Sequence, residues 1–559
     1  MMLLSQAAQI LGGTLIGKDV GFATVSSDSR SIEAGDLFVA LQGPNFDGSA
    51  FVNDAAQAGA VAAMINQRTE AGVLRTEQHK GFPHSSVLSS QLPLLLVEDT
   101  RLALGKLAAH WRQQFAIPLI AITGSNGKTT VKEMLASILR TAAGSENAVL
   151  ATAGNLNNDI GLPLTLLKMN AAHRYAVIEM GMNHAGEIDY LTRLAQPDVA
   201  VINNAGSAHL AGLGSVAAVA RAKGEIFAGL AAQGIAVINA DDLHAPLWRD
   251  LAGKHPIIEF GLEKNVAVHA QWQTRGYGAH IVVSTLQGSF NAQLQVPGVH
   301  NVRNALAATA AALAVRVPLP AIAAGLAKYA GMAGRMQRRD AVHGATLIDD
   351  TYTANPNSLR AALKVLVQST GKKILVLGDM GELGEDAVRL HREVGTEARH
   401  LGVDQMLTLG ELTPYAVQEF GPGARHFERL EDLLAALKKN LDATSTVLVK
   451  GSRFMHMERV VQHCTEDRES KPEDRKTPAA PGLLLSSGLL SLSSVQCCTT
   501  RSICMKREPF TRTVLVASRF FFSAASRSSR RSKWRAPGPN SCTAYGVNSP
   551  SVSIWSTPR

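Results

Sequence analysis

Short runs of apolar residues alternate along most of the chain with longer segments in which apolar residues recur every three or four positions. The short runs predict buried strands, and the longer segments predict amphipathic helices. The predicted strands are residues 117–122, 176–180, 199–203, 235–238, 345–349, 373–377 and 446–449. Because strands and helices alternate, we predict an α/β protein built on parallel sheets, with ligands at the carboxyl ends of the strands.

Residues 117–133 have the sequence IPLIAITGSNGKTTVKE, which predicts a strand, a glycine-containing turn and the start of a helix. In such a turn the backbone N–H groups and the positive end of the helix converge on an anion, so we predict a phosphate site. Lys128 would reach the outer phosphates of a nucleotide, and the Thr129 hydroxyl would bind Mg²⁺. The usual pattern has a glycine five positions before Gly127, where this chain has Ile122. The alternative interpretation is an ordinary surface turn with a solvated lysine.

Polar residues follow the next predicted strands of the middle region. Glu179 ends one strand, Asn203 and Asn204 follow another, and Asn239 ends a third. A carboxylate at a strand end opposite a phosphate loop can complete a Mg²⁺ site, because this cation prefers oxygen ligands. Glu179 is our candidate, and the alternative is a solvent-facing glutamate before a glycine turn.

The first 113 residues predict a small mixed α/β domain. The opening sequence MMLLSQAAQILGG lacks a basic start and predicts an amphipathic helix instead of a signal peptide, which favours a cytoplasmic protein. Ser27, Asp28, Ser29 and Arg30 precede a predicted strand and could hold a nucleotide or a sugar, with Arg30 near a phosphate. A solvated loop that caps a turn is an equally good interpretation of these four residues.

The tail differs from the rest of the 559-residue chain in charge, cysteine content and periodicity. Fifteen of the 55 Lys and Arg residues and only six of the 46 Asp and Glu residues lie in residues 465–559, so this tail carries the whole formal charge of +9. All five cysteines lie at position 464 or later, and a body without cysteine fits a reducing compartment. We predict that the tail is irregular, either disordered or the product of a frameshift. No apolar run in the chain approaches the roughly 18 residues that could span a bilayer.

Several motifs together resemble those of the Mur ligases, a family of ATP-dependent amide-forming enzymes of bacterial cell-wall synthesis. The motifs are TGSNGKTT, TAGNLNNDIGLPLTLL, EMGMNHAGEI, PGVHNVRNALAA, DDTYTANPNS, LGDMGELG and KGSRFMHMERVV. The resemblance spans residues 1–462 in the correct order and explains Ile122, since TGSNGKTT is the family's own form of the phosphate loop. The motifs are most similar to those of the member that adds D-alanyl-D-alanine to UDP-N-acetylmuramoyl-tripeptide.

The resemblance implies three domains and a tail. These are a UDP-binding domain at residues 1–113, a central P-loop ATPase domain with a parallel sheet at 114–331, a Rossmann-like domain that brings the dipeptide at 332–464, and the tail at 465–559. The implied cofactors are ATP and Mg²⁺, and the implied partners are the UDP-linked tripeptide and D-alanyl-D-alanine. A cytoplasmic monomer is expected, with no membrane insertion and no nucleic acid on the body of the chain.

The resemblance also implies roles for individual residues. Catalysis would fall to Lys128, Glu179, His209 and Lys223, and Lys223 matches a position that is often carbamylated in the family. Mg²⁺ would bind to Thr129, Glu179 and His209. ATP would contact Gly124, Ser125, Asn126, Gly127, Lys128, Thr129, Thr130, Asn239, His300, Asn301, Asn304, Arg335, Asp350 and Tyr352. The substrates would contact Ser27, Asp28, Ser29, Arg30, Gly43, Asp47, Gly48, Asn155, Asn157, Asn158, Asn355 and Pro356.

One departure and two alternatives remain. The family usually has histidine where this chain has Ser49, which puts one contact to uracil in doubt. A folylpolyglutamate synthetase shares the phosphate loop but would not have a UDP domain before it. The other alternative is a nucleotide-dependent binding module whose basic tail, with Trp534 among arginines, contacts nucleic acid.

Overall fold

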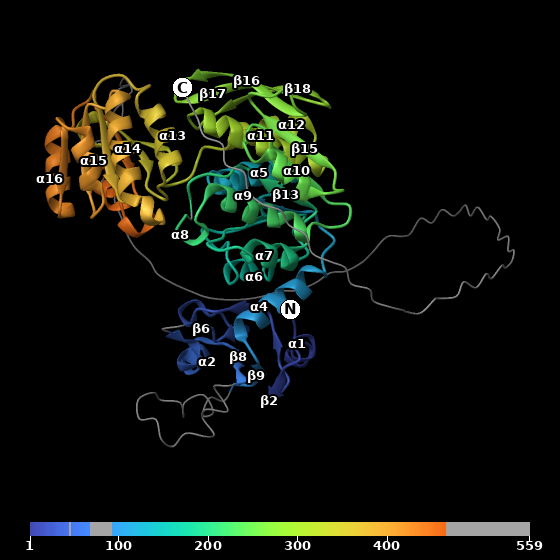
Figure 1. Ribbon diagram of the computed structural model, residues 1–559. Coiled ribbons are helices and arrows are strands. Elements are labelled where there is room, and N and C mark those ends of the chain that lie inside the picture. Colours follow the sequence, from blue (N-terminus) through green and yellow to red (C-terminus); the bar gives the residue numbers. More distant parts are fainter. Residues whose placement is uncertain (44–45, 68–91, 209, 466–559) are drawn as a thin grey trace, which may run out of the picture. The chain divides into compact units, whose positions relative to one another are not determined.

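The computed structural model describes residues 1–43, 46–67, 92–208 and 210–465 (Figure 1). These residues belong to one compact unit, Met1–Arg475. The predicted tail lies outside the described residues except for Thr465. Within the described part of the chain, no helix is both long enough and apolar enough to cross a bilayer.

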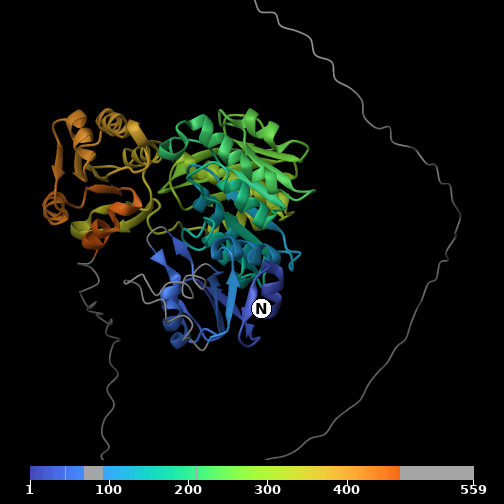
Figure 2. The ribbon, with the colours of Figure 1, turned by 60° about the horizontal axis from the view of Figure 1, so that its bottom comes forward.

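The first sheet has five short strands, coloured blue in Figures 1 and 2. Their order across the sheet is β2 (Thr14–Ile16), β9 (Leu94–Val97), β8 (Ala62–Asn66), β5 (Asp36–Val39) and β4 (Thr24–Ser26). All neighbours are parallel except β2 and β9. The helices are α1 (Leu4–Leu11), α2 (Val52–Ala58) and α4 (Thr100–Arg112). The predicted opening helix is therefore confirmed as α1.

The second sheet has nine strands. In order they are β11 (Val149–Ala151), β12 (Tyr175–Glu179), β10 (Leu119–Thr123), β13 (Val199–Ile202), β14 (Ile235–Asn239), β15 (Ile257–Gly261), β16 (Val268–Arg275), β17 (Gly278–Thr285) and β18 (Gly288–Leu294). The strands from β11 to β16 are parallel, as predicted. The pairs β16–β17 and β17–β18 are antiparallel, and the sequence pattern did not predict these hairpins.

Helices bury both faces of the parallel part of this sheet. They are α5 (Lys128–Ala143), α6 (Gly161–Leu166), α7 (Glu187–Ala195), α8 (Leu210–Leu213), α9 (Val216–Gly224), α10 (Ala245–Ala252), α11 (Val299–Ala314) and α12 (Leu319–Lys328). In β10, Ile120 and Ile122 pack into the core shared with α5, α11 and α12, whereas Leu119 and Ala121 face the opposite core. Ile122 is fully buried, so the position that carries glycine in the usual phosphate-loop pattern is here a core position.

The third sheet has six strands, in the order β19 (Gln337–Asp340), β20 (Thr346–Asp350), β24 (Thr446–Lys450), β21 (Lys373–Gly378), β22 (Gln405–Leu409) and β23 (Ala424–Phe427). Only β19 is antiparallel to its neighbour. The helices are α13 (Pro356–Leu366), α14 (Ala387–His400), α15 (Thr413–Phe420), α16 (Leu430–Asn440) and α17 (Glu458–Thr465). The three strands predicted for this region are confirmed as β20, β21 and β24.

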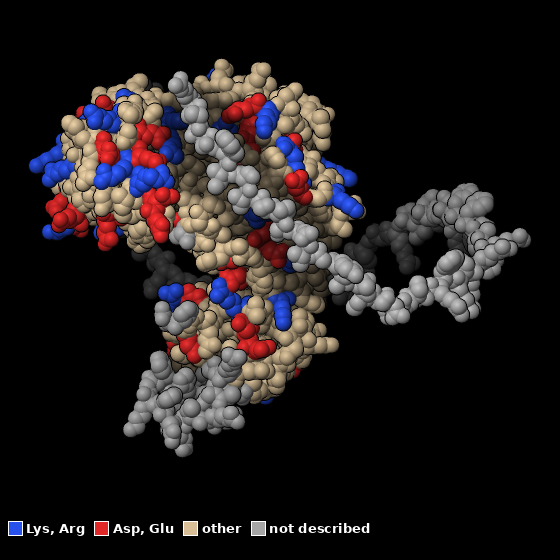
Figure 3. Space-filling model, viewed as in Figure 1, with Lys and Arg blue, Asp and Glu red and all other residues tan. Residues whose placement is uncertain are grey.

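Charged side chains of both signs are mixed on the face that Figure 3 shows. This mixture agrees with the balanced charge of residues 1–464, because the excess of Lys and Arg over Asp and Glu lies in the tail.

Candidate active site

The turn between β10 and α5 is held by the segment that follows β13. Lys128 is the first residue of α5, and its Nζ donates to the Gly124 carbonyl oxygen at 2.7 Å. The Ser125 N–H donates to the Asn204 carbonyl oxygen at 3.0 Å, and the Asn126 N–H donates to Asn204 Oδ1 at 2.9 Å. The predicted strand, turn and helix are thus confirmed, and Asn204 fixes the shape of the turn.

Gly127 is required in this turn for two reasons. Its φ is +78°, a region that residues with a side chain rarely adopt. A Cβ atom at this position would also lie 2.6 Å from Asn203 Nδ2 and closer still to Asn304 Oδ1. The glycine therefore allows two side chains to approach the backbone of the phosphate loop.

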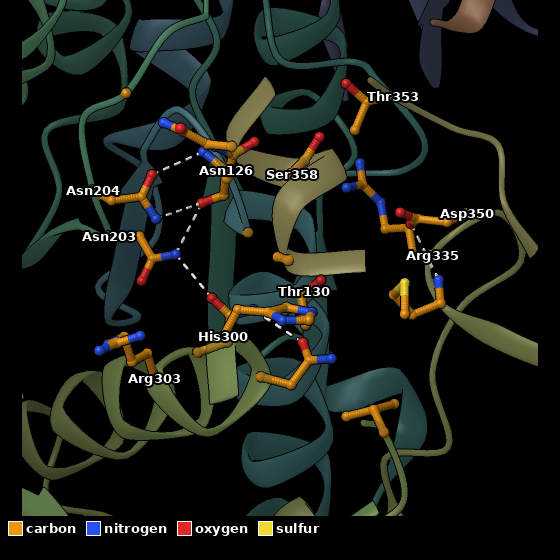
Figure 4. Close-up of a pocket in the computed structure, with 18 of the residues that line it drawn as sticks. Asn126, Thr130, Asn203, Asn204, His300, Arg303, Arg335, Asp350, Thr353 and Ser358 are labelled. Carbon is orange, nitrogen blue, oxygen red and sulfur yellow. Dashed lines mark hydrogen bonds between the residues drawn. The ribbon is translucent and has the colours of Figure 1, made fainter. Parts of the chain in front are cut away.

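These two side chains belong to a chain of buried asparagines. Asn203 Nδ2 donates to the Asn126 carbonyl oxygen and to Asn304 Oδ1, each at 2.9 Å. Asn304 Nδ2 in turn donates to Asn301 Oδ1 at 3.1 Å. Because Asn301 and Asn304 lie in the first turns of α11, the network joins this helix to the phosphate loop. Figure 4 shows Asn203 and Asn204 on one side of Asn126, with His300 and Arg303 on α11 below.

A cavity of about 280 Å³ lies beside this network. It is lined by the phosphate loop, by Asn239 at the end of β14 and by His300 on α11, and on the side of the third sheet by Arg335 and Asp350. Burial lowers the pKa of His300 to about 4, and the charges of Lys450 and Arg303 act in the same direction. The amides and the neutral imidazole of this cavity suit the uncharged base and ribose of a nucleotide, and the cations Arg303, Arg335 and Lys450 also line it.

A second cavity, of about 590 Å³, lies along Lys128 and Thr129. Glu179 lines it and is only 3% exposed. Its Oε1 accepts a hydrogen bond from Asn157 Nδ2 at 2.8 Å, while its Oε2 is buried without a partner among the described residues. A buried carboxylate oxygen without a donor is suited to a cation, so the residues present fit the predicted Mg²⁺ site.

Two lysines share this side of the site. Burial lowers the pKa of Lys128, and the Glu179 carboxylate opposes the shift. Lys223, near the end of α9, is 1% exposed, and no described residue forms a hydrogen bond or ion pair with its amino group. Burial lowers the pKa of Lys223 well below its usual value, and the charge of Lys128 lowers it further. A lowered pKa favours the neutral amine, which is the form that carbamylation requires.

Arg335 contacts both the phosphate loop and the segment after β20. Its Nη2 donates to Thr129 Oγ1 at 2.9 Å, and its guanidinium group lies 4.3 Å from the centroid of the Tyr352 ring. Arg335 also lines both cavities. The positive charge of Arg335 therefore lies where phosphate groups next to Lys128 would carry negative charge. A Mg²⁺ ion at Thr129 would have to displace Arg335 from the Thr129 hydroxyl.

Asp350 forms a buried ion pair that the sequence did not predict. Asp350 and Lys450 are register partners at the ends of β20 and β24. Lys450 Nζ donates to Asp350 Oδ2 and, at 2.8 Å, to the Thr353 carbonyl oxygen. Burial raises the pKa of Asp350, and Lys450 opposes that shift. The signal in the sequence was a lysine that directly ends the apolar run TVLV.

Asn355 connects the third sheet's side of the site to the phosphate loop. Its Nδ2 donates to Asn126 Oδ1 at 2.7 Å, and its Oδ1 accepts the Ser358 N–H at 2.9 Å as the N-cap of α13. Pro356 is the first residue of that helix. The side chain predicted to contact substrate is thus engaged with a nucleotide-loop residue in this structure.

The remaining predicted substrate residues fall into two groups. Asn155 and Asn157 line the second cavity. Neither cavity is lined by Ser27, Asp28, Ser29, Arg30, Gly43, Asp47, Gly48 or Asn158.

Asp28 and Arg30 form an exposed ion pair, which lowers the pKa of Asp28 to about 2, and Asp28 caps the turn at Ser29–Ser31. Asp47 Oδ1 accepts the N–H of Ser49, a buried residue. Asn158 Oδ1 accepts the Gly161 N–H at the start of α6. The cap formed by Asp28 matches the alternative interpretation given for residues 27–30. The predicted roles of residues 27–30, Gly43, Asp47 and Gly48 in binding UDP, and of Asn158 in binding substrate, stay predictions. His209 lies outside the described residues.

Comparison with known proteins covers nearly all of the described chain. Family models match residues 22–112 (Mur ligase family, catalytic domain), 122–312 (Mur ligase middle domain) and 334–453 (Mur ligase, glutamate ligase domain). The UDP-N-acetylmuramoyl-tripeptide--D-alanyl-D-alanine ligase of Escherichia coli K12 is 40% identical over 470 residues, which cover 83% of this chain and 98% of the relative.

Two solved structures are similar throughout the same region. MurF from Acinetobacter baumannii superposes with a TM-score of 0.73 at 36% identity, over 82% of this chain and 97% of that one. MurF ligase from Thermotoga maritima, solved in complex with ADP, has a TM-score of 0.66 at 27% identity, over 80% of this chain and 98% of that one.

Proposed function

The chain belongs to the Mur ligase family, and we propose that it joins D-alanyl-D-alanine to UDP-N-acetylmuramoyl-tripeptide. As a member of this family it is an ATP-dependent ligase that forms a C–N bond. The observation that carries the choice of substrates is the 40% identity over 98% of a relative that bears this name. The predicted family and fold class are thereby confirmed.

In the proposed reaction, the γ-phosphoryl group of ATP passes to the terminal carboxylate of the tripeptide, which gives ADP and an acyl phosphate. The amine of D-alanyl-D-alanine then attacks the acyl carbon, the C–N bond forms, inorganic phosphate leaves and the nitrogen loses a proton. Phosphoryl transfer of this kind needs mainly positioning and neutralisation of charge. Lys128 and Arg335 supply that positive charge on one side of the phosphate loop.

The two cavities support a division of the ligands between them. The base and ribose of ATP would occupy the smaller cavity, beside Asn239, His300, Asn301 and Asn304, while the phosphates would pass over Gly127 toward Lys128. The carboxylate that is activated would then lie in the larger cavity, near Glu179 and Asn157. When bound at Glu179, Mg²⁺ would neutralise the phosphate oxygens, and the orphaned Oε2 of Glu179 supports this assignment.

Contacts across the site support closure of the third sheet's side over the phosphate loop. Asn355 bonds to Asn126, and Arg335 bonds to Thr129, so both sides of the site are joined at the loop itself. Closure of this kind excludes water from a reactive acyl phosphate, which water would otherwise hydrolyse.

The finer assignments are part of the same proposal. We assign UDP binding to residues 1–113, ATP binding to 114–331 and dipeptide binding to 332–464, in a cytoplasmic monomer. Carbamylation of Lys223 and Mg²⁺ binding at His209 and Thr129 also belong to it. The buried amino group of Lys223, for which no described residue provides a hydrogen bond or an ion pair, supports the first of these.

The test is a phosphate-release assay with UDP-N-acetylmuramoyl-tripeptide, ATP and D-alanyl-D-alanine. We expect release only when all three are present, and abolition of turnover in Lys128→Ala. The exposed Lys168 offers a matched control, because Lys168→Ala should retain activity. ADP release that does not depend on the dipeptide, or an active Lys128→Ala enzyme, would refute the proposal.

A further inference from the structure

Lys132 lies one helical turn beyond Lys128 on α5, and it is fully buried. Its Nζ donates to the Thr152 carbonyl oxygen at 2.5 Å and pairs with Glu133 Oε1 at 2.7 Å. Its neighbours Val131, Met134 and Leu135 are fully buried apolar residues. Removing a lysine amino group from water is costly even when it is paired, so an apolar side chain would be the more stable choice here. The position therefore calls for a functional explanation.

Thr152, the partner of Lys132, also holds the backbone of Glu179. Thr152 follows β11, and its N–H donates to the Val177 carbonyl oxygen at 3.1 Å. Its Oγ1 accepts the N–H of Glu179 at 2.9 Å. Three polar groups of one buried residue thus connect the amino group of Lys132 with the end of β12.

The segment that begins at Thr152 holds the carboxylate of Glu179 as well. Asn157, five residues later, donates from Nδ2 to Glu179 Oε1 and leaves Oε2 without a partner among the described residues. The backbone and the side chain of Glu179 are therefore both fixed by residues 152–157, and Lys132 fixes the start of this segment against α5.

We propose that Lys132 is a positioning residue that sets the separation between Glu179 and the phosphate-loop residues Lys128 and Thr129. Lys128, Thr129 and Lys132 all lie within the first two turns of α5. The bond between Lys132 and Thr152 therefore fixes the distance between this helix and the carboxylate that would bind the cation. Lys132 lines neither of the two cavities. The inference rests on the proposed function only in that Glu179 binds the Mg²⁺ that accompanies the nucleotide.

The test compares ADP binding with and without Mg²⁺ by calorimetry in wild type and in Lys132→Met. Methionine has similar length and no charge, and Glu133 is 22% exposed, so water can solvate Glu133 once its partner is gone. We expect metal-free ADP affinity to stay within twofold of wild type, while the gain in affinity that Mg²⁺ provides falls at least tenfold. An unchanged Mg²⁺-dependent gain would overturn the proposal, as would a wild-type protein whose ADP affinity does not respond to Mg²⁺.

Three further variants separate positioning from general damage. Thr152→Val keeps the carbonyl group but removes the hydroxyl that holds Glu179, so it should lower the same Mg²⁺-dependent gain without touching Lys132. Lys132→Arg keeps a cationic donor and should restore part of the gain. Lys168→Met places the same substitution at an exposed lysine and should behave as wild type. Loss in Lys168→Met equal to that in Lys132→Met would contradict the inference.

These measurements use ADP and Mg²⁺ alone and do not involve the dipeptide or the UDP-linked substrate. A different acceptor for the ligase would therefore leave the expected result unchanged, so failure of the proposed substrates and failure of the positioning role are distinguishable.

Discussion

Gly127→Ala tests how the phosphate loop is built. An alanine at φ +78° costs about 1 kcal/mol relative to glycine, because its Cβ crowds the backbone in this region. The methyl group would also lie 2.6 Å from Asn203 Nδ2 and closer to Asn304 Oδ1, so the bond between these side chains must break or shift. Disrupting a buried hydrogen bond and leaving its partners unpaired costs a further ~2 kcal/mol.

If the nucleotide binds only to the native form of the loop, it must supply this total of about 3 kcal/mol, which corresponds to a loss of roughly 100-fold in affinity for the nucleotide. We expect this loss in the Kd for ADP, measured by calorimetry. Gly186→Ala is a matched control, because Gly186 also precedes a helix with a positive φ, +85°, yet a Cβ there would meet no atom within 4 Å. ADP affinity of Gly127→Ala within threefold of wild type, or equal losses in both variants, would refute the reasoning.

Three further variants test the surroundings of the site. Lys450→Met should destabilise the protein by about 3–5 kcal/mol in urea unfolding, because it leaves the buried Asp350 carboxylate without its cation. The double variant Lys450→Met/Asp350→Asn should recover most of that loss, and equal stability of the single and the double variant would contradict this. Asn355→Ala should lower the free energy of unfolding by ~1 kcal/mol, because α13 loses its cap, and should raise the KM for ATP, because the bond to Asn126 is lost. Asn355→Ser should recover the stability but not the KM, since serine can cap α13 but is too short to reach Asn126. His300 has a folded-state pKa of about 4, below its unfolded value, so the unfolded state takes up more protons as pH falls from 6.5 toward 4 and the protein loses stability. The urea midpoint of His300→Gln should therefore fall less between pH 7 and pH 4.5 than that of wild type, and an equal fall in both proteins would argue against this.

The strands that the sequence predicted correctly are those that are buried on both faces. Each predicted strand of the second sheet is buried on both faces, so most of its residues are apolar. β20, β21 and β24 are buried as well, and each contains a short apolar run even where its ends are polar. The hairpins β16–β18 were missed because they are partly exposed. Trp272 is 39% exposed and Val282 36%. Polar residues alternate with apolar ones along β16 and β18, and the apolar run in β17 has only three residues, 281–283.

The part of the site that the sequence could not predict depends on distant pairing. Asn355 lies 229 positions from Asn126, and Lys450 lies 100 positions from Asp350. The second pair is set by the register of two parallel strands, which no local pattern encodes. The resemblance implied that Asp350 and Asn355 belong to the site, but only the structure showed that they contact Lys450 and Asn126.

Arg335 belongs to the linings of both cavities and also bonds to the phosphate loop. A ligand in either cavity therefore changes the surroundings of a side chain that the other cavity uses. If nucleotide binding alters the affinity for the acceptor by some factor, the acceptor must alter the affinity for nucleotide by the same factor, because the two binding free energies are linked through one closed cycle. Arg335 therefore provides a physical route for such a coupling between the two halves of the site, and the coupling free energy is the same whichever ligand binds first, although the kinetics can still favour one order.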